Sequence, residues 1–271
     1  MPTRELSTGA TVSFEDHGSG RPIILLHGVA MSRAFFERNV DDLAKDHRVI
    51  ALDFRGHGSS PQTGDGHSVA QYARDVRALV EDLDLHGAVL VGWSMGSLVI
   101  WDYLRQFGED ERVSGVVIVS QGPSDLIQDD WPHGIADHET LREYLDMMQD
   151  DARGFLAGFL PEMFHTAPDE ATIERLLDDI CRAGANTATL ILADQTVQDY
   201  RADIPGYQVP HLLVWGSDEK VVKLASADWL SAQLPNAQVH VFETSGHCPM
   251  WEEPDAFNAL VRNWVVTLPV T

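Results

Sequence analysis

A serine flanked by glycines is the residue of this chain best suited to nucleophilic chemistry. Ser94 is the centre of the pentapeptide GWSMG, which follows an apolar run at residues 88–91 and precedes a segment of helical character at residues 97–107. On a tight strand-to-helix turn, a serine is held in a strained backbone conformation that pushes its hydroxyl clear of the sheet, and the glycines let the helix approach closely. This position between a strand and a helix predicts that Ser94 is a nucleophile.

A serine hydroxyl is a poor nucleophile until a base takes its proton, and the base must lie on a loop after a late strand to reach it. Of the twelve histidines, only His247 occupies such a place. It follows a predicted strand that ends at Glu243 and precedes the last predicted helix. We therefore expect His247 to be the general base.

The histidine needs a carboxylate that fixes its tautomer, and on this kind of sheet the acid lies between the serine and the histidine in the chain. The strand predicted at residues 209–216 is followed by two adjacent acids, Asp218 and Glu219. One of them should serve the histidine and the other should be solvated, and the residues alone leave both assignments open.

Acyl transfer also needs two N–H donors for the oxyanion. Met95, the residue after the nucleophile, offers the first, and we assign the second to Val29 in the loop after the first parallel strand. His27, at the end of that strand, is expected to bond the loop backbone. The turn at residues 53–59 is expected to be scaffold.

No cofactor and no metal are expected. The glycines at positions 18 and 20 lack the third glycine of a dinucleotide-binding loop, and no phosphate-binding glycine-rich loop with a lysine occurs. Cys181 and Cys248 are too few for a disulfide framework, have no zinc-like Cys/His spacing, and are predicted to be packing residues. The paired aspartates, as at 41–42, lack the alternating pattern of a calcium loop.

Apolar runs and amphipathic segments alternate, which is typical of an α/β protein with a doubly wound, mostly parallel sheet. Strands are predicted at residues 22–27, 48–53, 88–92, 113–120, 209–216 and 237–243, with an antiparallel edge strand at 10–15. Helices are predicted at residues 36–46, 68–85, 97–107, 223–234 and 254–266.

The alternation stops between Ser120 and Val209. That stretch holds no good strand and four predicted helices, at residues 137–148, 151–159, 169–183 and 188–200. We expect residues 1–121 and 205–271 to form the core that contains the sheet, and residues 122–204 to form an inserted helical cap over the strand ends. Most apolar residues of the cap should pack the cap onto itself and onto the sheet, whereas three are expected to face the serine and bind substrate: Met148, Phe159 and Met163.

Composition excludes several classes of function. The chain has 271 residues, of which 44% are hydrophobic, enough for one large globular domain. With 19 Lys and Arg against 42 Asp and Glu, its formal charge of −23 would repel nucleic acid and anionic membrane surfaces. No apolar run approaches the length of a membrane span, and the first residues lack the apolar region of a signal peptide. We expect a cytoplasmic protein with no nucleic-acid or membrane partner, and the sequence leaves open whether it forms a homodimer.

Four motifs, in order, make the chain resemble the capped branch of the α/β-hydrolase superfamily. They are His27-Gly28, DFRGHGS at residues 53–59, the pentapeptide around Ser94, and GHCPMWEEP at residues 246–254. The resemblance covers nearly the whole chain and implies the α/β-hydrolase fold, with Ser94 as nucleophile and His247 as base. A serine in place of aspartate at the nucleophile position argues against the haloalkane dehalogenase and epoxide hydrolase relatives.

The acid position departs from the pattern of that family, which is Gly-x-x-Asp followed after two or three residues by proline. Counted from Gly216, the acid position falls on Glu219, and Lys223 replaces the proline. Glu219 is therefore our first choice. Asp218 remains the alternative, because aspartate is the commoner acid and a loop shift of one residue would exchange the two. A glutamate in this register resembles some N-acyl-homoserine lactonases, which makes lactones candidate substrates.

Together, the residues and the resemblance predict a serine hydrolase that cleaves a small or medium apolar carboxylic ester or lactone through an acyl-enzyme. One alternative is a cofactor-free perhydrolase, similar to haloperoxidases, in which peroxide replaces water on the same acyl-enzyme. The other is a non-catalytic ligand receptor that has kept a hydrolase fold. Such a receptor would normally have a damaged triad, and no triad position is lost here.

Overall fold

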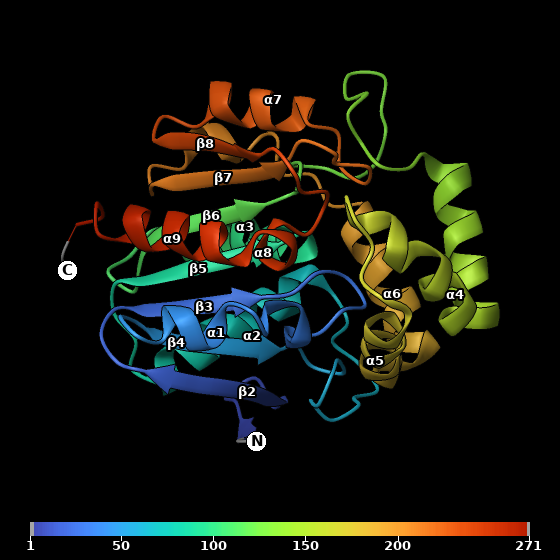
Figure 1. Ribbon diagram of the computed structural model, residues 1–271, viewed down its shortest axis with the longest axis horizontal. Coiled ribbons are helices and arrows are strands. Elements are labelled where there is room, and N and C mark those ends of the chain that lie inside the picture. Colours follow the sequence, from blue (N-terminus) through green and yellow to red (C-terminus); the bar gives the residue numbers. More distant parts are fainter. Residues whose placement is uncertain (1–2, 270–271) are drawn as a thin grey trace.

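A single eight-stranded sheet forms the centre of the protein in the computed structural model, which describes residues 3–269 (Figure 1). The strand order is β1-β2-β4-β3-β5-β6-β7-β8. Neighbours from β4 through β8 are parallel, whereas β2 is antiparallel to both β1 and β4. The strands are β1 (Thr3–Glu5), β2 (Thr11–Gly18), β3 (Pro22–Leu26), β4 (Arg48–Asp53), β5 (Ala88–Trp93), β6 (Val113–Val119), β7 (His211–Gly216) and β8 (Ala237–Phe242).

The four adjacent strands β3, β5, β6 and β7 are buried along their whole length. Every residue of β3, β5, β6 and β7 is buried, as expected for β-branched and apolar strands with helices on both faces. β8 is more exposed because it lies at the edge of the sheet. The predicted doubly wound, mostly parallel sheet is confirmed.

Helices cover both faces of the sheet and form two apolar clusters with it (Figure 1). One face carries α2 (Val69–Asp82), α3 (Met95–Phe107) and α7 (Ala225–Gln233). The other face carries α1 (Val40–Leu43), α8 (Pro249–Glu252) and α9 (Pro254–Val265). Within residues 3–269, no helix combines the length and the apolar character that crossing a bilayer requires.

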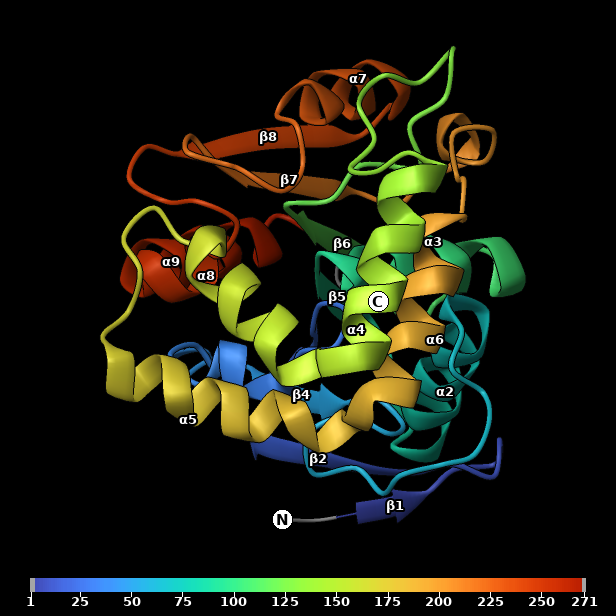
Figure 2. The same ribbon diagram turned by 90° about the vertical axis from the view of Figure 1, so that its right-hand side faces the viewer.

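Three further helices follow β6 and precede β7, and we call them the α4–α6 layer. They are α4 (His138–Phe159), α5 (Glu170–Ile180) and α6 (Gly184–Thr196), joined by the 3-10 turns η2 (Leu160–Met163) and η3 (Cys181–Ala183), and a last turn, η4 (Ile204–Gly206), leads to β7. Figures 1 and 2 show that this layer lies across the end of the sheet to which the parallel strands point. The carboxyl ends of parallel strands are where loops from different parts of the chain converge.

Two predicted helices of this segment meet at a kink. Residues 138–159 are one continuous helix in outline, but Asp151 has non-helical angles, φ −148° and ψ 78°. Its carboxylate accepts a hydrogen bond from the Gly154 amide at 2.9 Å, as at the start of a new helix. The predicted division of the stretch therefore falls at Asp151.

Other element boundaries were predicted less well. Of the helix predicted at residues 36–46, only the short α1 forms, and the 3-10 turn η1 (Arg33–Phe36), whose Phe35 stacks on Trp93 at 4.8 Å, precedes it. The helix predicted at 188–200 ends early, since Tyr200 turns back to the core, where its amide donates to the Pro123 carbonyl at 3.0 Å. Strand β1 was missed.

Candidate active site

Ser94 lies at the turn between β5 and α3, with backbone angles φ 53° and ψ −125°. A positive φ at a non-glycine residue costs about 1–3 kcal/mol and persists only where its surroundings enforce it. Here the Ser94 amide donates to the Val119 carbonyl at 2.9 Å, and its carbonyl accepts from the Ser97 amide at 2.8 Å. The strained turn that the sequence predicts at Ser94 is therefore present.

The glycines on either side of this turn are required by close packing. A Cβ on Gly96 would lie 2.2 Å from the carbonyl oxygen of Leu26 in the neighbouring strand. A Cβ on Gly92 would lie 2.5 Å from the Gly96 backbone. Helix α3 thus begins directly against the sheet, and the approach leaves no room for a side chain.

We expect Gly96→Ala to lower the free energy of unfolding by about 2 kcal/mol or more, because rigid backbone rather than a flexible side chain meets the new methyl group. Urea unfolding followed by circular dichroism measures the change. The matched control is Gly158→Ala in α4, where nothing lies within 4 Å of the new Cβ and stability should be kept or raised. Equal stability of the two variants would contradict the close approach.

His247 lies between β8 and α8 with its side chain 2% exposed. Its amide donates to the Met163 carbonyl in η2 at 2.7 Å. Its carbonyl accepts from the Trp93 indole Nε1 at 2.8 Å, and Trp93 directly precedes Ser94. These bonds fix the His247 backbone between the α4–α6 layer and the turn that carries Ser94.

Glu219 is the acid that reaches His247. The His247 Nδ1 lies 3.0 Å and 3.1 Å from the two carboxylate oxygens of Glu219, whose side chain is 1% exposed. Asp218 points elsewhere: its side chain is 41% exposed and lies 3.1 Å from His165 Nδ1 and 3.3 Å from Lys220 Nζ. The structure brings Glu219, not Asp218, to the histidine.

Backbone amides of the loop after β7 fix the position of the Glu219 carboxylate. Its Oε1 also accepts from the amides of Val221 at 2.8 Å and Val222 at 3.1 Å. Burial by itself would raise the pKa of Glu219, but the electrostatic interaction with His247 and the hydrogen bonds to the carboxylate outweigh burial and lower that pKa. Glu219 therefore stays ionised beside His247.

The loop after β3 passes beside Ser94 and contains Val29. A Cβ on Gly28 would lie 3.3 Å from the Ser94 Cβ, and Val29 lines the same cavity as Ser94. Within residues 3–269 no acceptor takes the Val29 N–H. The Met95 N–H is the first of α3 and has no acceptor in a preceding helical turn.

His27 stabilises the loop after β3 through hydrogen bonds of its ring. Its Nδ1 lies 2.8 Å from the Gly28 carbonyl, and its Nε2 accepts from the Phe54 amide at 3.1 Å. Burial and the neighbouring His57 lower the pKa of His27 well below its ordinary value, so the ring is neutral. His27 bonds the loop backbone, as the sequence led us to expect.

A cavity of about 290 Å³ connects these groups. Ser94, His247 and Val29 line it, and so do Met148, Phe159 and Met163, the three residues expected to bind substrate. The Met95 side chain is buried in the core and contributes no lining. Most of the lining residues are apolar or aromatic, and the α4–α6 layer with its turn η2 contributes seven of them: Tyr144, Met148, Phe155, Leu156, Phe159, Met163 and Leu192.

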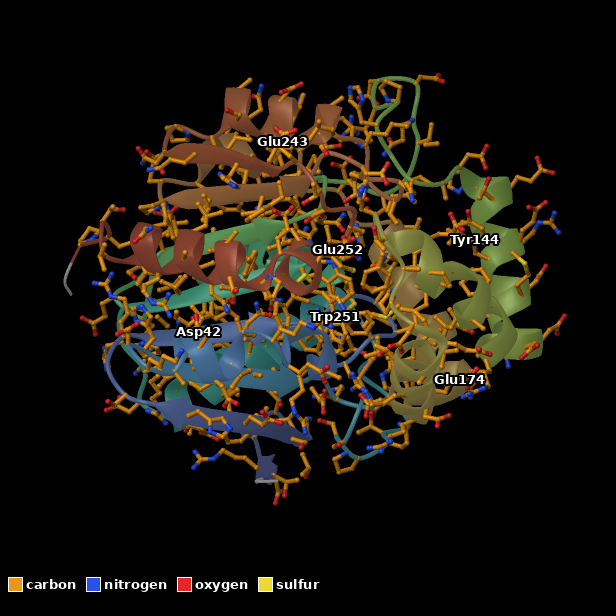
Figure 3. The ribbon with its side chains drawn as sticks, in the orientation of Figure 1. Asp42, Tyr144, Glu174, Glu243, Trp251 and Glu252 are labelled. Atoms are coloured by element: carbon orange, nitrogen blue, oxygen red, sulfur yellow. The ribbon has the colours of Figure 1, made fainter. Side chains whose placement is uncertain are left out.

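Sequence reasoning missed Glu252, which joins the two sides of the site. Glu252, labelled in Figure 3, belongs to α8, and its carboxylate accepts from the amides of His165 and Gly246, both at 2.7 Å. Gly246 directly precedes His247, whereas His165 follows η2. The motif GHCPMWEEP contains Glu252, but only the fold shows that its partner comes from residue 165.

Asp125 and Gln195 were also missed, although both line the cavity. They are 70 residues apart in the chain and are brought together by a hydrogen bond of 3.1 Å. Within residues 3–269, no group of three or more His, Cys, Asp or Glu side chains is arranged to hold a metal ion.

Known proteins resemble this chain over almost its whole length. The model of the alpha/beta hydrolase family matches residues 23–260. A non-heme chloroperoxidase from Streptomyces lividans is 32% identical over 269 residues, covering 95% of this chain and 97% of that protein. An esterase from Rhodococcus sp. ECU1013 has a TM-score of 0.83 at 28% identity, covering 99% of this chain and 100% of that one. An esterase from Exiguobacterium antarcticum has a TM-score of 0.92 at 24% identity, covering 97% and 98%. The chain belongs to the alpha/beta hydrolase family.

Proposed function

We propose that the protein is a serine hydrolase that cleaves a small or medium apolar carboxylic ester or lactone. The observation that carries the proposal is the pairing of His247 with the buried Glu219 in a cavity that also exposes the strained Ser94. A nucleophile, a base and an acid that orients the base are the parts that acyl transfer requires. The reaction needs no cofactor.

In the proposed mechanism, the Ser94 hydroxyl attacks the carbonyl carbon while His247 takes its proton. Glu219 holds the other ring nitrogen and balances the charge of the imidazolium. The amides of Val29 and Met95 stabilise the oxyanion. His247 then protonates the leaving alcohol. In the second half-reaction, His247 deprotonates a water molecule, which attacks the acyl-enzyme, and the acid is released as Ser94 regains its proton.

The substrate is inferred from the cavity. Its volume of about 290 Å³ and its largely apolar wall suit a short acyl or alcohol chain rather than a polymer. We infer that the α4–α6 layer acts as the cap, with residues 122–204 inserted into a core of residues 1–121 and 205–271. On this proposal, Met148, Phe159 and Met163 contact the chain of the substrate.

A turnover screen with p-nitrophenyl esters from acetate to dodecanoate, and with lactones of increasing ring and chain size, tests the proposal. The acyl-enzyme should appear as a burst of p-nitrophenol and as an added acyl mass on the peptide that contains Ser94. Binding of these compounds without turnover would instead favour a ligand receptor.

Perhydrolysis is the second candidate, because a relative at 32% identity is named a non-heme chloroperoxidase. Hydrogen peroxide would replace water in the second half-reaction, so that the acyl-enzyme yields a peracid and free Ser94. An assay with added peroxide and acetate, in which the peracid oxidises bromide, distinguishes perhydrolysis from hydrolysis. Turnover of esters without peracid formation would reject this candidate.

Met148→Phe is expected to reduce kcat/KM for long acyl chains about tenfold relative to acetate, because the larger ring fills part of the cavity. The ratio of kcat/KM across the ester series measures this effect. Met147→Phe is the matched control: Met147 is the adjacent residue of α4, is 45% exposed and does not line the cavity. An unchanged ranking in Met148→Phe would show that the pocket for the chain lies elsewhere.

A further inference from the structure

A polar corner interrupts the apolar wall of the cavity. It consists of Asp125, from the loop after β6, and of Gln195 and Thr196, from the last turn of α6. The three residues are 1%, 3% and 3% exposed and line the same cavity as Ser94 and His247. The proposed hydrolysis uses none of them.

The Asp125 carboxyl is held by neutral donors. The Gln121 Nε2 donates to Oδ1 at 2.6 Å, and the Gln195 Nε2 donates to Oδ2 at 3.1 Å. The Asp125 carbonyl accepts from the amides of Ile135 at 2.7 Å and Ala136 at 3.2 Å, which fixes the backbone as well. The position of the carboxyl is thus set by both the core and the α4–α6 layer.

No salt bridge compensates this carboxyl within residues 3–269. In the part of the chain that the structure describes, no Lys, Arg or His forms a salt bridge with Asp125. Burial raises the pKa of Asp125 to about 7, against the hydrogen bond from Gln121 and the electrostatic interaction with His247. An apolar residue would fill this place at a lower cost, so the carboxyl points to a contact with a ligand.

The polar corner has unfilled acceptors. Each Asp125 oxygen accepts one hydrogen bond from the protein side chains and can accept another. The Gln195 Oε1 is buried with no partner. A buried acceptor left without a donor costs about 1–3 kcal/mol. A bound molecule that brings an O–H or N–H would remove that cost.

We propose that the polar corner is a subsite that recognises a hydroxyl or amide N–H on an otherwise apolar ester or lactone. The inference rests on the proposed function and narrows its substrate class. Ser94 fixes the position of the substrate carbonyl, and the apolar wall binds the alkyl chain of the substrate. Asp125 and Gln195 can therefore form hydrogen bonds only with a donor group at one distance from that carbonyl. A hydroxyl suits the corner best, because it can donate to the ionised form of Asp125 and accept from the neutral form.

Matched ester pairs test the subsite. Each p-nitrophenyl alkanoate is compared with the same ester carrying a hydroxyl, or in a second series an acylamino group, at successive carbons. At one position the wild-type kcat/KM should exceed that of the plain ester by about tenfold or more. The two series distinguish a hydroxyl from an amide N–H as the recognised donor. No preference at any position in either series would overturn the proposal.

Asp125→Leu should abolish that preference, measured as the ratio of kcat/KM within each ester pair, because the leucine keeps the branched shape of the aspartate side chain and has no acceptor. Asp125→Asn, which retains the shape of the side chain and one acceptor oxygen, should reduce the preference. It replaces the leucine variant in the assay if the leucine variant does not fold. Leu192→Ala is the control: Leu192 lines the same cavity without a polar side-chain atom, so chain-length ranking should change and the hydroxyl preference should not.

A structural role alone predicts a different result, since the Asp125–Gln195 bond also joins the core to α6. In that case the Asp125 variants would lose activity on both members of a pair in parallel, which would overturn the subsite. If the wild type cleaves no ester, the proposed function fails but the subsite is still tested. Calorimetry with Ser94→Ala should then show tighter binding of an alkanediol than of the matching alkanol, a difference that Asp125→Leu removes. Equal binding of the two would overturn the subsite.

Discussion

Ser94→Ala is expected to lower ester turnover by about 10³-fold or more while the protein remains folded. The substitution removes the only atom that forms a bond to the substrate in the proposed reaction. The alanine keeps the backbone with its φ of 53°, and within residues 3–269 the lost hydroxyl makes no capping hydrogen bond to α3. We therefore expect Tm to change little. Initial rates on the best ester of the screen and a thermal unfolding curve measure the two effects.

The matched control is Ser231→Ala, a serine on the exposed side of α7 that should leave both rate and Tm unchanged. The acyl mass on the peptide around Ser94 should disappear in Ser94→Ala. Full turnover by Ser94→Ala on several esters would reject the serine mechanism. A large drop in Tm would instead show that the hydroxyl supports the fold.

Local patterns in the sequence were enough to predict the turn at Ser94. The apolar run of β5, the two glycines and the start of α3 are adjacent in the chain, and close packing leaves one backbone arrangement for them. The position of the acid was likewise predicted from its spacing along the chain after Gly216. A Cβ on Gly216 would lie 2.2 Å from the Gly246 carbonyl oxygen, so the two loops that carry Glu219 and His247 must touch.

Residues that act across the fold could not be predicted in this way. Asp125 lies in a loop without a motif, and its partner Gln195 lies in the last turn of α6, where the sequence does not distinguish a buried glutamine from an exposed one. Glu252 stands inside a recognised motif, yet its role depends on the amide of His165. Sequence periodicity predicts which face of a helix is buried, but not which distant loop it meets.

Glu219→Gln is expected to lower kcat by several orders of magnitude, about 10³–10⁴-fold, whereas Asp218→Asn should change it by less than about twofold. The two positions are adjacent and the two substitutions are chemically equivalent, so each is the control for the other. At position 219 the amide removes the charge that balances the imidazolium and presents the wrong hydrogen-bonding group to His247 Nδ1. At position 218 it weakens only exposed contacts to His165 and Lys220.

The lowered pKa of Glu219 sets the expected pH dependence. A carboxyl whose pKa is lowered in the folded protein remains ionised below the ordinary range of a glutamate, so its contribution is present above that range and is lost only at lower pH. Hence Glu219 should stay ionised where a solvated glutamate titrates, so that a loss of activity at low pH reports protonation of the base His247 rather than of Glu219, and Asp218→Asn should have the same pH profile. The Glu219→Gln variant should turn over substrate slowly at every pH, because no pH restores the missing carboxylate charge. If Asp218→Asn proved the damaging change instead, the loop after β7 would have to shift by one residue, against the two bonds from Val221 and Val222 that hold Glu219 in place.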